Sequence, residues 1–589
     1  MQEIDKKRHS LSHLLAMAIL EKFPRAKLGI GPVIENGFYY DFDGIKISDE
    51  DLKNLEGAML KLINKNIKFE KKIITPKEAE KLFKDQPYKL ELIREFKKGK
   101  KTISIYKSDN FIDLCSGPHV KNTKEINPKS FKLIKTAGAY WRGDEKNKML
   151  TRIYGLYFDK EEELNDYLKS LEYAQKCDHR TLGERLNIFM VDEEIGKGLP
   201  LLLPQGYLLR RRLEDYIYNL ERENGYQHVL TPVLAKEDLY KKSGHLAHYR
   251  DDMYSPIEIE NEKYYLKPMN CPHHHSIYKR NIRSYKDLPL RLAEFGHVHR
   301  YERSGVLTGL IRVRGFTQND SHIYMKKEDL EKEIENVLKM AQKVYRDFKI
   351  TDYWYRLSLP DFKNKEKYGD IKNKKMWSDG SNVLKRALKN LGHKFTEAIG
   401  EATFYGPKID IQIKNILGKE DTIGTVQVDY YSASRFNLFY IDKDGKEKPV
   451  VIVHRAIMGS FERFMAFLLE KTCGNLPLWI SPIQVKIIPV GEKFNDYGEN
   501  ILKKLRENGI YAEIDKENET LGKRIRNAEI QKIPYILVIG EREKNEKTVS
   551  VRESGMINTE DDNYKKQNIG VMPFEKFIEK IKKEIEEKR

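Results

Sequence analysis

The chain has 589 residues, of which 40% are hydrophobic and 33% are charged, and its formal net charge is +17. One hydrophobic core rarely grows beyond about 250–300 residues, so this length excludes a single small domain, and the lack of any run of about 18 apolar residues excludes a transmembrane helix. The positive charge favours a polyanionic partner such as a nucleic acid, although a lysine-rich composition that only solvates the surface gives the same value.

Two features of the chain predict a cytoplasmic protein. The apolar stretch near the N-terminus is interrupted at His13 and has no small-residue cleavage site, so it does not resemble a signal peptide. The four cysteines are widely separated, which argues against a disulfide framework and leaves single cysteines available for metal binding or reactivity: Cys115, Cys177, Cys271 and Cys473.

The first part of the chain is predicted to be a mixed α/β domain, residues 1–158, followed by a connecting helix within residues 159–180. The domain opens with a helix around His9 to Phe23 and includes a strand-like run at residues 102–106. Apolar side chains between residues 160 and 176 recur at helical spacing, which indicates the connecting helix.

The rest of the chain is predicted to form two more domains. Residues 181–480 contain long β-rich runs, including KYYLKPM and GTVQVDYYSASRFNLFYI, separated by irregular loops, which favours an antiparallel sheet. Residues 481–589 alternate short buried strands with amphipathic helices, which is typical of a compact α/β domain. The predicted fold class is therefore a multidomain α+β / α/β protein.

Two sets of histidines and cysteines could bind a metal or polarise water. His9 and His13 are four residues apart on the predicted first helix, so their imidazoles share a face, and Cys115 and His119 repeat the spacing in the same domain. The alternative is a set of core histidines with satisfied hydrogen bonds beside an inert thiol.

The second set is scattered along the central region, where Cys271, His322 and His454 match no local zinc motif. Three ligands with an open fourth position are nevertheless what a catalytic or substrate-binding zinc ion requires. The run of histidines at 273–275 cannot direct all three side chains at one ion from regular structure.

Arginine placement suggests an anion site of an unusual type. Arg300 lies two residues before Glu302, and Arg463 lies in a helix predicted to begin near Gly459. Guanidinium groups suit triphosphate oxygens, but an isolated arginine is more often a solvated surface residue. The chain contains neither a P-loop nor a dinucleotide-binding glycine motif, so neither of those sites is indicated, and spacing alone does not show that ATP binds here.

Longer segments around these residues resemble class II aminoacyl-tRNA synthetases. EFGHVHRYERSG with RVRGFTQNDSHIY is similar to motif 2 of that class, GSFERFMAFLLE to motif 3, and NGYQHVLTPVL to motif 1. Within the class, the segments TAGAYWRGDEKNKMLTRIYG, DLCSGPHV, LKPMNCPHH, TFYGPKIDIQI and VHRAIMGSFERF resemble threonyl-tRNA synthetases in order and spacing. The likeness spans essentially the whole chain and implies an editing domain, a class II antiparallel core flanked by helices and an anticodon-binding domain.

The resemblance implies a threonine-activating site in the central domain. A zinc ion would be held by Cys271, His322 and His454, and the threonine would also contact Met269, Asp320, Tyr405 and Gln427. ATP, with Mg²⁺, would be bound by Glu302, Arg312, Phe316, Thr425 and Ser460. The catalytic residues would be Arg300 and Arg463 at the phosphates, Lys408 at the reacting carboxylate and His245 in transfer to the tRNA ribose.

The resemblance also implies a second, hydrolytic site. Serine lacks only one methyl group of threonine, which is worth about 1–3 kcal/mol, so binding alone excludes it poorly and seryl-tRNA must be hydrolysed. The editing residues would be His9, His13, Asp113, Cys115 and His119, and whether they bind a metal is left open. The anticodon loop of tRNA(Thr) would contact Asn518, Arg526, Lys532, Glu543 and Arg552, and motif 1 would build a homodimer.

The chain departs from the family pattern in three places. It starts at the editing domain, whereas many members begin with a ubiquitin-like domain. Its segment KEDTIGTVQ leaves Thr422 unassigned as an ATP contact, and Tyr301 and Arg303 replace the commoner Asn and Pro of motif 2. The alternatives are a class II synthetase for another amino acid, such as proline or serine, and a non-catalytic tRNA-binding paralogue.

Overall fold

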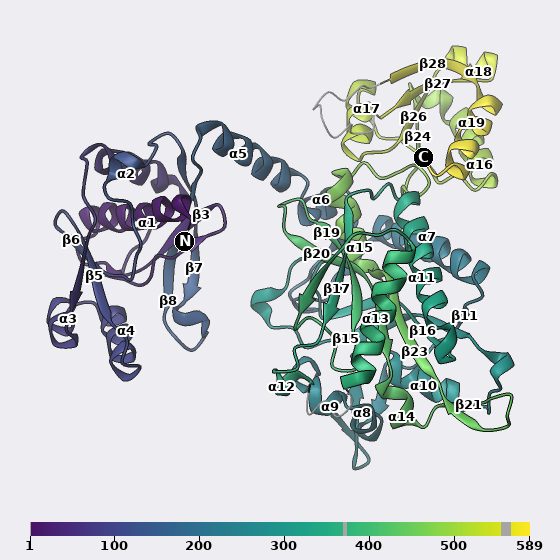
Figure 1. Cartoon of the computed structure of the whole chain (residues 1–589). Coiled ribbons are helices and arrows are strands. Elements are labelled where there is room, and N and C mark those ends of the chain that lie inside the picture. Colours follow the sequence, from purple (N-terminus) through teal and green to yellow (C-terminus); the bar gives the residue numbers. More distant parts are fainter. Residues whose placement is uncertain (1, 369–373, 555–566) are drawn as a thin grey trace. The chain divides into compact units, whose positions relative to one another are not determined.

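The computed structural model describes residues 2–368, 374–554 and 567–589. The chain forms two compact units, Met1–Glu172 and Tyr173–Arg589, and the predicted connecting helix is α5, Glu161–Lys176, at the border between them (Figure 1). Within the described ranges, every helix is too short or too polar to cross a membrane.

The first unit is built on a five-stranded antiparallel sheet and a smaller three-stranded one. The larger sheet has the order β1-β3-β8-β7, with β2 paired to β3, and the smaller has the order β4-β5-β6. The strands are β1 Lys27–Leu28, β2 Val33–Ile34, β3 Gly37–Asp43, β4 Glu70–Ile74, β5 Ile103–Ser108, β6 Phe111–Leu114, β7 Phe131–Tyr140 and β8 Met149–Tyr157. The helices are α1 Glu3–Lys22, α2 Leu52–Asn64, α3 Pro76–Leu82 and α4 Pro87–Lys98.

Helix α1 crosses the core of this unit and explains how two histidines on it reach a common site. Its apolar residues Leu11, Leu14, Leu15 and Ile19 are fully buried in the cluster that covers the larger sheet. His13 is buried with them, while His9, one turn earlier, stays partly exposed. The loop after β6 returns Cys115 and His119 to the same end of α1.

The second unit centres on an eight-stranded sheet of order β11-β15-β16-β23-β20-β19-β17-β18. All pairs are antiparallel except β11 with β15 and β17 with β18, so the predicted antiparallel sheet is confirmed. The strands are β11 Gln227–His228, β15 Leu290–His299, β16 Gly315–Met325, β17 Tyr353–Leu359, β18 Phe395–Ile399, β19 Lys408–Lys414, β20 Glu420–Asp429 and β23 Val451–Ser460.

Side-chain alternation gives this sheet one apolar face and one polar face. Residues such as Ile323, Val426 and Val453 point to the buried core, which is closed by helices α7 Pro204–Glu223, α11 Leu330–Asp347, α13 Lys374–Asn390 and α15 Phe461–Thr472 (Figure 1). Because successive residues of a strand face opposite sides, His322, Gln427 and His454 point away from that core. The polar face carries the candidate site.

The second unit also contains smaller elements. They are β9 Phe189–Met190, β10 Leu201–Leu202, β12 Leu234–Lys236, β13 Ile257–Ile259, β14 Glu262–Leu266, β21 Phe439–Ile441 and β22 Glu447–Pro449, with helices α6 His179–Arg185, α8 Glu237–Ser243, α9 His245–His248, α10 Cys271–Lys279, α12 Lys365–Tyr368 and α14 Tyr431–Phe436. Strand β14 leads into α10, which places Cys271 at the first turn of that helix.

The C-terminal part of the second unit has a five-stranded mixed sheet of order β25-β24-β26-β27-β28, as expected for an α/β domain. Its strands are β24 Val485–Pro489, β25 Ala512–Ile514, β26 Tyr535–Ile539, β27 Thr548–Glu553 and β28 Gln567–Pro573. Its helices are α16 Asn495–Glu507, α17 Leu521–Ile530, α18 Glu541–Glu546 and α19 Phe574–Glu586.

Two sequence expectations are wrong in detail. The run GTVQVDYYSASRFNLFYI is not continuously extended, because the Asp429 carboxylate accepts hydrogen bonds from the backbone N–H groups of Tyr431 and Ser432 and starts helix α14. The wide spacing of the four cysteines argues against a disulfide framework, but Cys177 and Cys473 form a disulfide across 296 residues, with their Cα atoms 4.6 Å apart. Sequence spacing gives no sign of this pair, since the contact is entirely tertiary.

Candidate functional sites

The register of the large sheet places four polar side chains in one row on its open face. His322 of β16 pairs with His454 of β23, His454 pairs with Gln427 of β20, and Gln427 pairs with Lys408 of β19. Cross-strand partners on one face have Cβ atoms about 4.5–5.5 Å apart, so residues distant in sequence become neighbours. The rings of His322 and His454 have centroids 4.5 Å apart.

The three residues predicted to bind zinc come together at this row. One donor atom each from Cys271, His322 and His454 lies within 4.8 Å of the other two, and all three side chains are buried. Burial lowers the pKa of His322 and keeps its imidazole neutral, which is the form that coordinates a cation. Nε2 of His322 is buried and has no hydrogen-bond partner among the described residues. A soft thiol, two imidazoles and an orphaned nitrogen fit a zinc ion.

In each of the two imidazoles, of His322 and His454, one ring nitrogen forms a hydrogen bond with a protein group on the side away from the cavity. His454 Nε2 lies 2.9 Å from the Asp429 carboxylate, and His322 Nδ1 lies 2.9 Å from Nδ1 of His274. The ring atoms left for a cation are therefore Nδ1 of His454 and Nε2 of His322. Such outer contacts fix the tautomer and orientation of a metal-binding histidine.

A cavity of about 460 Å³ opens over the row. Ten predicted site residues line it: Met269, Cys271, Arg300, Asp320, His322, Tyr405, Lys408, Thr425, Gln427 and His454. The Asp320 carboxylate accepts a hydrogen bond from Asn270 at 2.9 Å, and the Tyr405 hydroxyl donates to Gln427. The cavity thus has hydrogen-bonding groups beside the three metal donors, as a small polar ligand requires.

The remaining residues predicted to bind the nucleotide form a connected group outside that lining. The Arg300 guanidinium lies 5.1 Å from the centroid of the Phe316 ring, and Arg312 donates to Glu302 at 2.9 Å. Arg463 donates to the carbonyl oxygen of Ile311, and its backbone N–H is capped by the hydroxyl of Ser460. Three guanidinium groups therefore gather near one loop, the one that carries residues 300–312.

His245 also lies outside the lining of the cavity. Its side chain is buried behind Phe404, with ring centroids 6.1 Å apart, and its Nδ1 lies 2.7 Å from the hydroxyl of Ser243. Burial lowers the pKa of His245 to about 3, so the ring is neutral at physiological pH.

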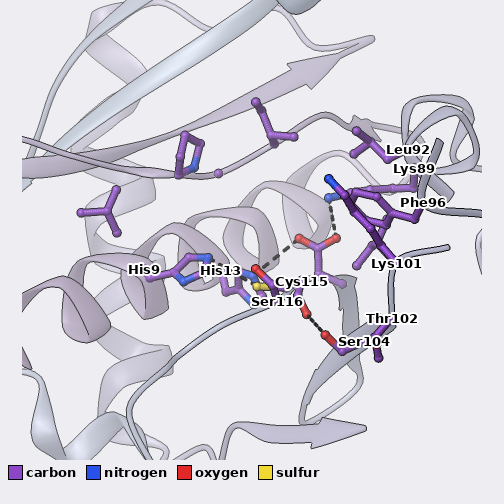
Figure 2. A pocket seen from close by; sticks show the side chains of 16 residues that line it. His9, His13, Lys89, Leu92, Phe96, Lys101, Thr102, Ser104, Cys115 and Ser116 are labelled. Carbon is purple, nitrogen blue, oxygen red and sulfur yellow. Dashed lines mark hydrogen bonds and ion pairs between the residues drawn. The ribbon is translucent and has the colours of Figure 1, made fainter. Parts of the chain in front are cut away.

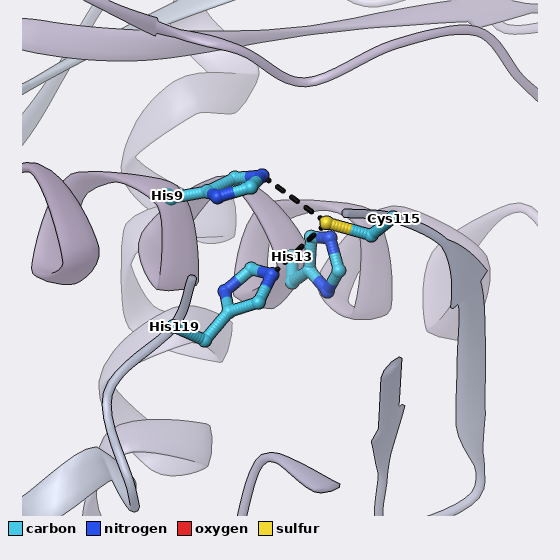
Figure 3. Close-up of side chains that lie close together, drawn as sticks. All are labelled: His9, His13, Cys115 and His119. Carbon is cyan, nitrogen blue, oxygen red and sulfur yellow. Dashed lines mark hydrogen bonds between the residues drawn. The ribbon is translucent and has the colours of Figure 1, made fainter. Parts of the chain in front are cut away.

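The first unit holds a second cluster, in which all four expected residues meet. Donor atoms of His9, His13, Cys115 and His119 lie within 4.8 Å of one another. The Cys115 sulfur is 3.4 Å from Nε2 of His9 and 3.2 Å from Nε2 of His119, and Figure 3 shows both nitrogens directed at it. The hydrogen bond from Nδ1 of His9 to the carbonyl oxygen of Pro118 leaves its Nε2 with a lone pair.

This cluster lies at one end of a cavity of about 660 Å³. Figure 2 shows His9, His13 and Cys115 on one side and Lys89 with Lys101 on the other. Lys89 is buried, 2.6 Å from the carboxylate of Asp113, and donates to the hydroxyl of Tyr40. Lys89 was missed by the sequence analysis because it belongs to no local motif and is joined to Asp113 only by the fold.

The thiol in this cavity is not a nucleophile at neutral pH. Burial raises the pKa of Cys115 to about 12, and the carboxylate of Asp113 adds to the effect. Burial also lowers the pKa of His9, so its ring is neutral and can accept a proton. The cavity offers a neutral base and a buried ammonium group, which suits hydrolysis by an attacking water molecule rather than covalent catalysis.

The five residues predicted to contact an anticodon come from different elements of the C-terminal part. Asn518 precedes α17, Arg526 lies on α17 and Arg552 on β27, and all three side chains are exposed. Glu543 accepts a hydrogen bond from the backbone N–H of Gly540 and so caps α18. Lys532 lines a cavity of about 210 Å³ together with residues 186–188. Their joint role stays a prediction.

Comparison with known proteins identifies relatives of each part. The tRNA synthetase class II core domain (G, H, P, S and T) matches residues 254–472, the anticodon binding domain matches 484–584, and the threonyl and alanyl tRNA synthetase second additional domain matches 103–154. The threonine–tRNA ligase of Anoxybacillus flavithermus (strain DSM 21510 / WK1) is 46% identical over 588 residues, 99% of this chain and 89% of the relative.

Two further proteins with similar sequences carry names of the same kind. Threonine–tRNA ligase 1 of Bacillus subtilis (strain 168) is 46% identical over 557 residues, 94% of this chain and 86% of the relative. The solved RNA binding domain of threonyl-tRNA synthetase from Cryptosporidium parvum Iowa II is 35% identical with a TM-score of 0.63, covering 69% of this chain and 98% of that one.

The raised thiol pKa predicts the reactivity of Cys115. With a pKa of about 12, its thiolate fraction at pH 8 is about 10⁻⁴, compared with roughly a quarter for a free cysteine. Alkylation by iodoacetamide at pH 8, followed on the Cys115 peptide by mass spectrometry, should be at least about 100-fold slower than that of the unfolded chain. The rate should still rise between pH 8 and 10, and a plateau below pH 9 would contradict the assigned pKa.

Proposed function

Because the chain belongs to the threonyl-tRNA synthetase family, we propose that its two cavities divide the work of a threonine–tRNA ligase. The cavity of the second unit activates threonine with ATP and passes it to tRNA(Thr), and the cavity of the first unit hydrolyses seryl-tRNA. The observation that carries the proposal is the convergence of Cys271, His322 and His454 on one point of the open sheet face.

Selection of the amino acid depends on groups that recognise a hydroxyl. A zinc ion held by Cys271, His322 and His454 would supply a Lewis acid with open positions for the amino and hydroxyl groups of threonine. The carboxylate of Asp320, at the wall of the same cavity, accepts a hydrogen bond from that hydroxyl. Valine would leave these buried polar groups unpaired, which costs far more than a missing methyl group.

Activation requires positive charge where the triphosphate reacts. Charge develops on the α-phosphate oxygens as the threonine carboxylate attacks, so preorganised cations lower the barrier. Arg300 and Lys408 line the cavity beside the row, and Arg463 stands with Arg312 near the adjoining loop, in position for the phosphates and their Mg²⁺. Glu302, Phe316, Thr425 and Ser460 complete the nucleotide contacts, and Met269, Tyr405 and Gln427 the threonine contacts.

Editing uses groups of the first unit. The ammonium group of Lys89 stabilises the negative charge that forms on the ester carbonyl oxygen, and neutral His9 takes a proton from the attacking water. Asp113 holds Lys89 in place, while His13, Cys115 and His119 shape the end of the cavity. This assignment adds Lys89 to the residues expected from the sequence.

The rest of the assignment concerns partners and domain borders. Residues 1–158 would form the editing domain, 181–480 the catalytic domain and 481–589 the anticodon-binding domain. Exposed Asn518, Arg526 and Arg552, with Lys532 and Glu543, would contact the anticodon loop of tRNA(Thr), and the motif 1 segment would form a homodimer. His245 would assist transfer to the tRNA ribose.

Replacing His322 by Ala tests the function directly. Without this donor the zinc ion is no longer held in place to bind the threonine hydroxyl. Threonine-dependent pyrophosphate exchange should therefore fall about 10³-fold or more, while the affinity for an ATP analogue changes less than about threefold. His393→Ala, a histidine bonded to Gln342 far from the cavity lining, serves as the control and should keep normal exchange. Equal loss of ATP binding and exchange, or exchange by the unaltered enzyme that runs with proline or serine and not with threonine, would refute the proposal.

Replacing Lys89 by Met tests the editing site. Hydrolysis of isolated seryl-tRNA(Thr) should slow by about 10²-fold or more, because the charge opposite the developing oxyanion is lost, while threonylation stays within about twofold. Lys101→Met removes an exposed lysine from the same cavity and should leave hydrolysis nearly unchanged. Circular dichroism of the Lys89→Met protein guards against unfolding, since Asp113 loses its partner. Undiminished hydrolysis by a folded Lys89→Met enzyme would show that the site is misassigned.

A further inference from the structure

A chain of buried hydrogen bonds runs from the metal-binding face of His322 into the interior. Nδ1 of His322 lies 2.9 Å from Nδ1 of His274, and Nε2 of His274 lies 3.0 Å from a carboxylate oxygen of Glu294. The exposed fraction of His322 and His274 is 0%, and that of Glu294 is 1%. Water does not reach these groups, so each must be satisfied by its protein neighbours.

The Glu294 carboxylate, at the buried end of this series of hydrogen bonds, determines which atom donates in each bond. Burial by itself would raise the pKa of Glu294, but hydrogen bonds from His274 and the Thr231 backbone, with the charge of Lys267, lower it to about 2. An ionised carboxylate only accepts hydrogen bonds. An imidazole that donates from Nε2 to this carboxylate and accepts at Nδ1 satisfies both contacts of His274, and its Nδ1 lone pair then accepts the Nδ1–H of His322.

The outcome is that Nε2 of His322 carries its lone pair toward the cavity. The opposite tautomer would put a proton on Nε2 and block coordination of a cation. The other imidazole of the site, His454, has a carboxylate directly behind it in Asp429, at 2.9 Å. Both imidazoles thus end on a carboxylate, one directly and one through an intervening histidine.

Glu294 is itself held by a framework that does not touch the cavity. Its carboxylate accepts from the backbone N–H of Thr231 at 2.8 Å and from the Thr231 hydroxyl at 3.0 Å, and Lys267 lies 3.3 Å away. This framework fixes the position of the carboxylate and keeps it ionised, and it reaches His322 only through Glu294 and His274.

On the basis of the proposed function, we propose that His274 and Glu294 are positioning residues that orient His322 for the zinc ion by a carboxylate–histidine–histidine relay. His274 lies within the run of three histidines that cannot share one ion. Of its neighbours, His275 bonds to the hydroxyl of Tyr324, and neither His273 nor His275 belongs to a group of metal donors in the described part of the chain. The middle histidine, His274, thus contacts a metal donor, His322, without being a donor itself.

The relay is tested by zinc affinity, measured on metal-free protein by competition with a chromophoric chelator. The variants are Glu294→Gln, His274→Leu, the double variant and His274→Asn. Loss of an outer partner typically weakens metal binding about 10–100-fold, and we expect this for Glu294→Gln and for His274→Leu. The double variant should bind no more weakly than His274→Leu alone, because Glu294 acts only through His274.

His274→Asn separates orientation from packing. The amide oxygen of Asn can accept the Nδ1–H of His322, whereas Leu fills the space without an acceptor, so the relay predicts tighter zinc binding by Asn than by Leu. Glu333→Gln is the matched control, since Glu333 is a buried carboxylate bonded to Arg291 on the same strand as Glu294, and it should bind zinc as the unaltered protein does.

Three results would overturn the relay: zinc binding by Glu294→Gln within twofold of the unaltered protein, multiplied losses in the double variant, or tighter binding by His274→Leu than by His274→Asn. If a variant does not fold, the remaining variants and the Asn/Leu comparison still decide. A failure of the unaltered protein to bind zinc would instead refute the proposed function, and the relay with it.

Discussion

The pairing of β16 with β23 is the constraint on which the catalytic cavity depends. It places His322 opposite His454, and the same row continues through Gln427 to Lys408. A slip of one residue in this register would turn both histidines into the apolar core and bring Ile323 and Val453 to the cavity. The helices on the opposite face bury those apolar residues, so the hydrophobic core enforces the register that the chemistry needs.

The two cavities contain similar donor atoms but hold them differently. In the second unit, the histidines of the proposed zinc site rest on buried carboxylates, directly through Asp429 or by way of His274 and Glu294. Such partners raise the basicity of an imidazole and favour a bound cation. In the first unit, Nδ1 of His9 rests on a backbone carbonyl, and the buried ion pair of Lys89 and Asp113 lines the same cavity. This arrangement suits a water molecule attacking an ester beside an ammonium group.

The architecture could be predicted well from the sequence, because local patterns of residue spacing and alternation determine its helices and strands. The helix of residues 161–176, the antiparallel central sheet and the C-terminal α/β part all follow from spacing and alternation. The metal donors came only from resemblance to a family, since Cys271, His322 and His454 meet through strand pairing and a helix start. Tertiary contacts without a local pattern were missed: the Cys177–Cys473 disulfide, Lys89, and the link from His274 to Glu294.

The central claim is that a zinc ion on one thiolate and two imidazoles recognises the threonine hydroxyl. X-ray absorption at the zinc edge tests it most directly. The account predicts one sulfur and two histidine ligands in the free enzyme, and a spectrum that changes when threonine is added and stays the same with valine. A site without sulfur, or a spectrum indifferent to threonine, would contradict it.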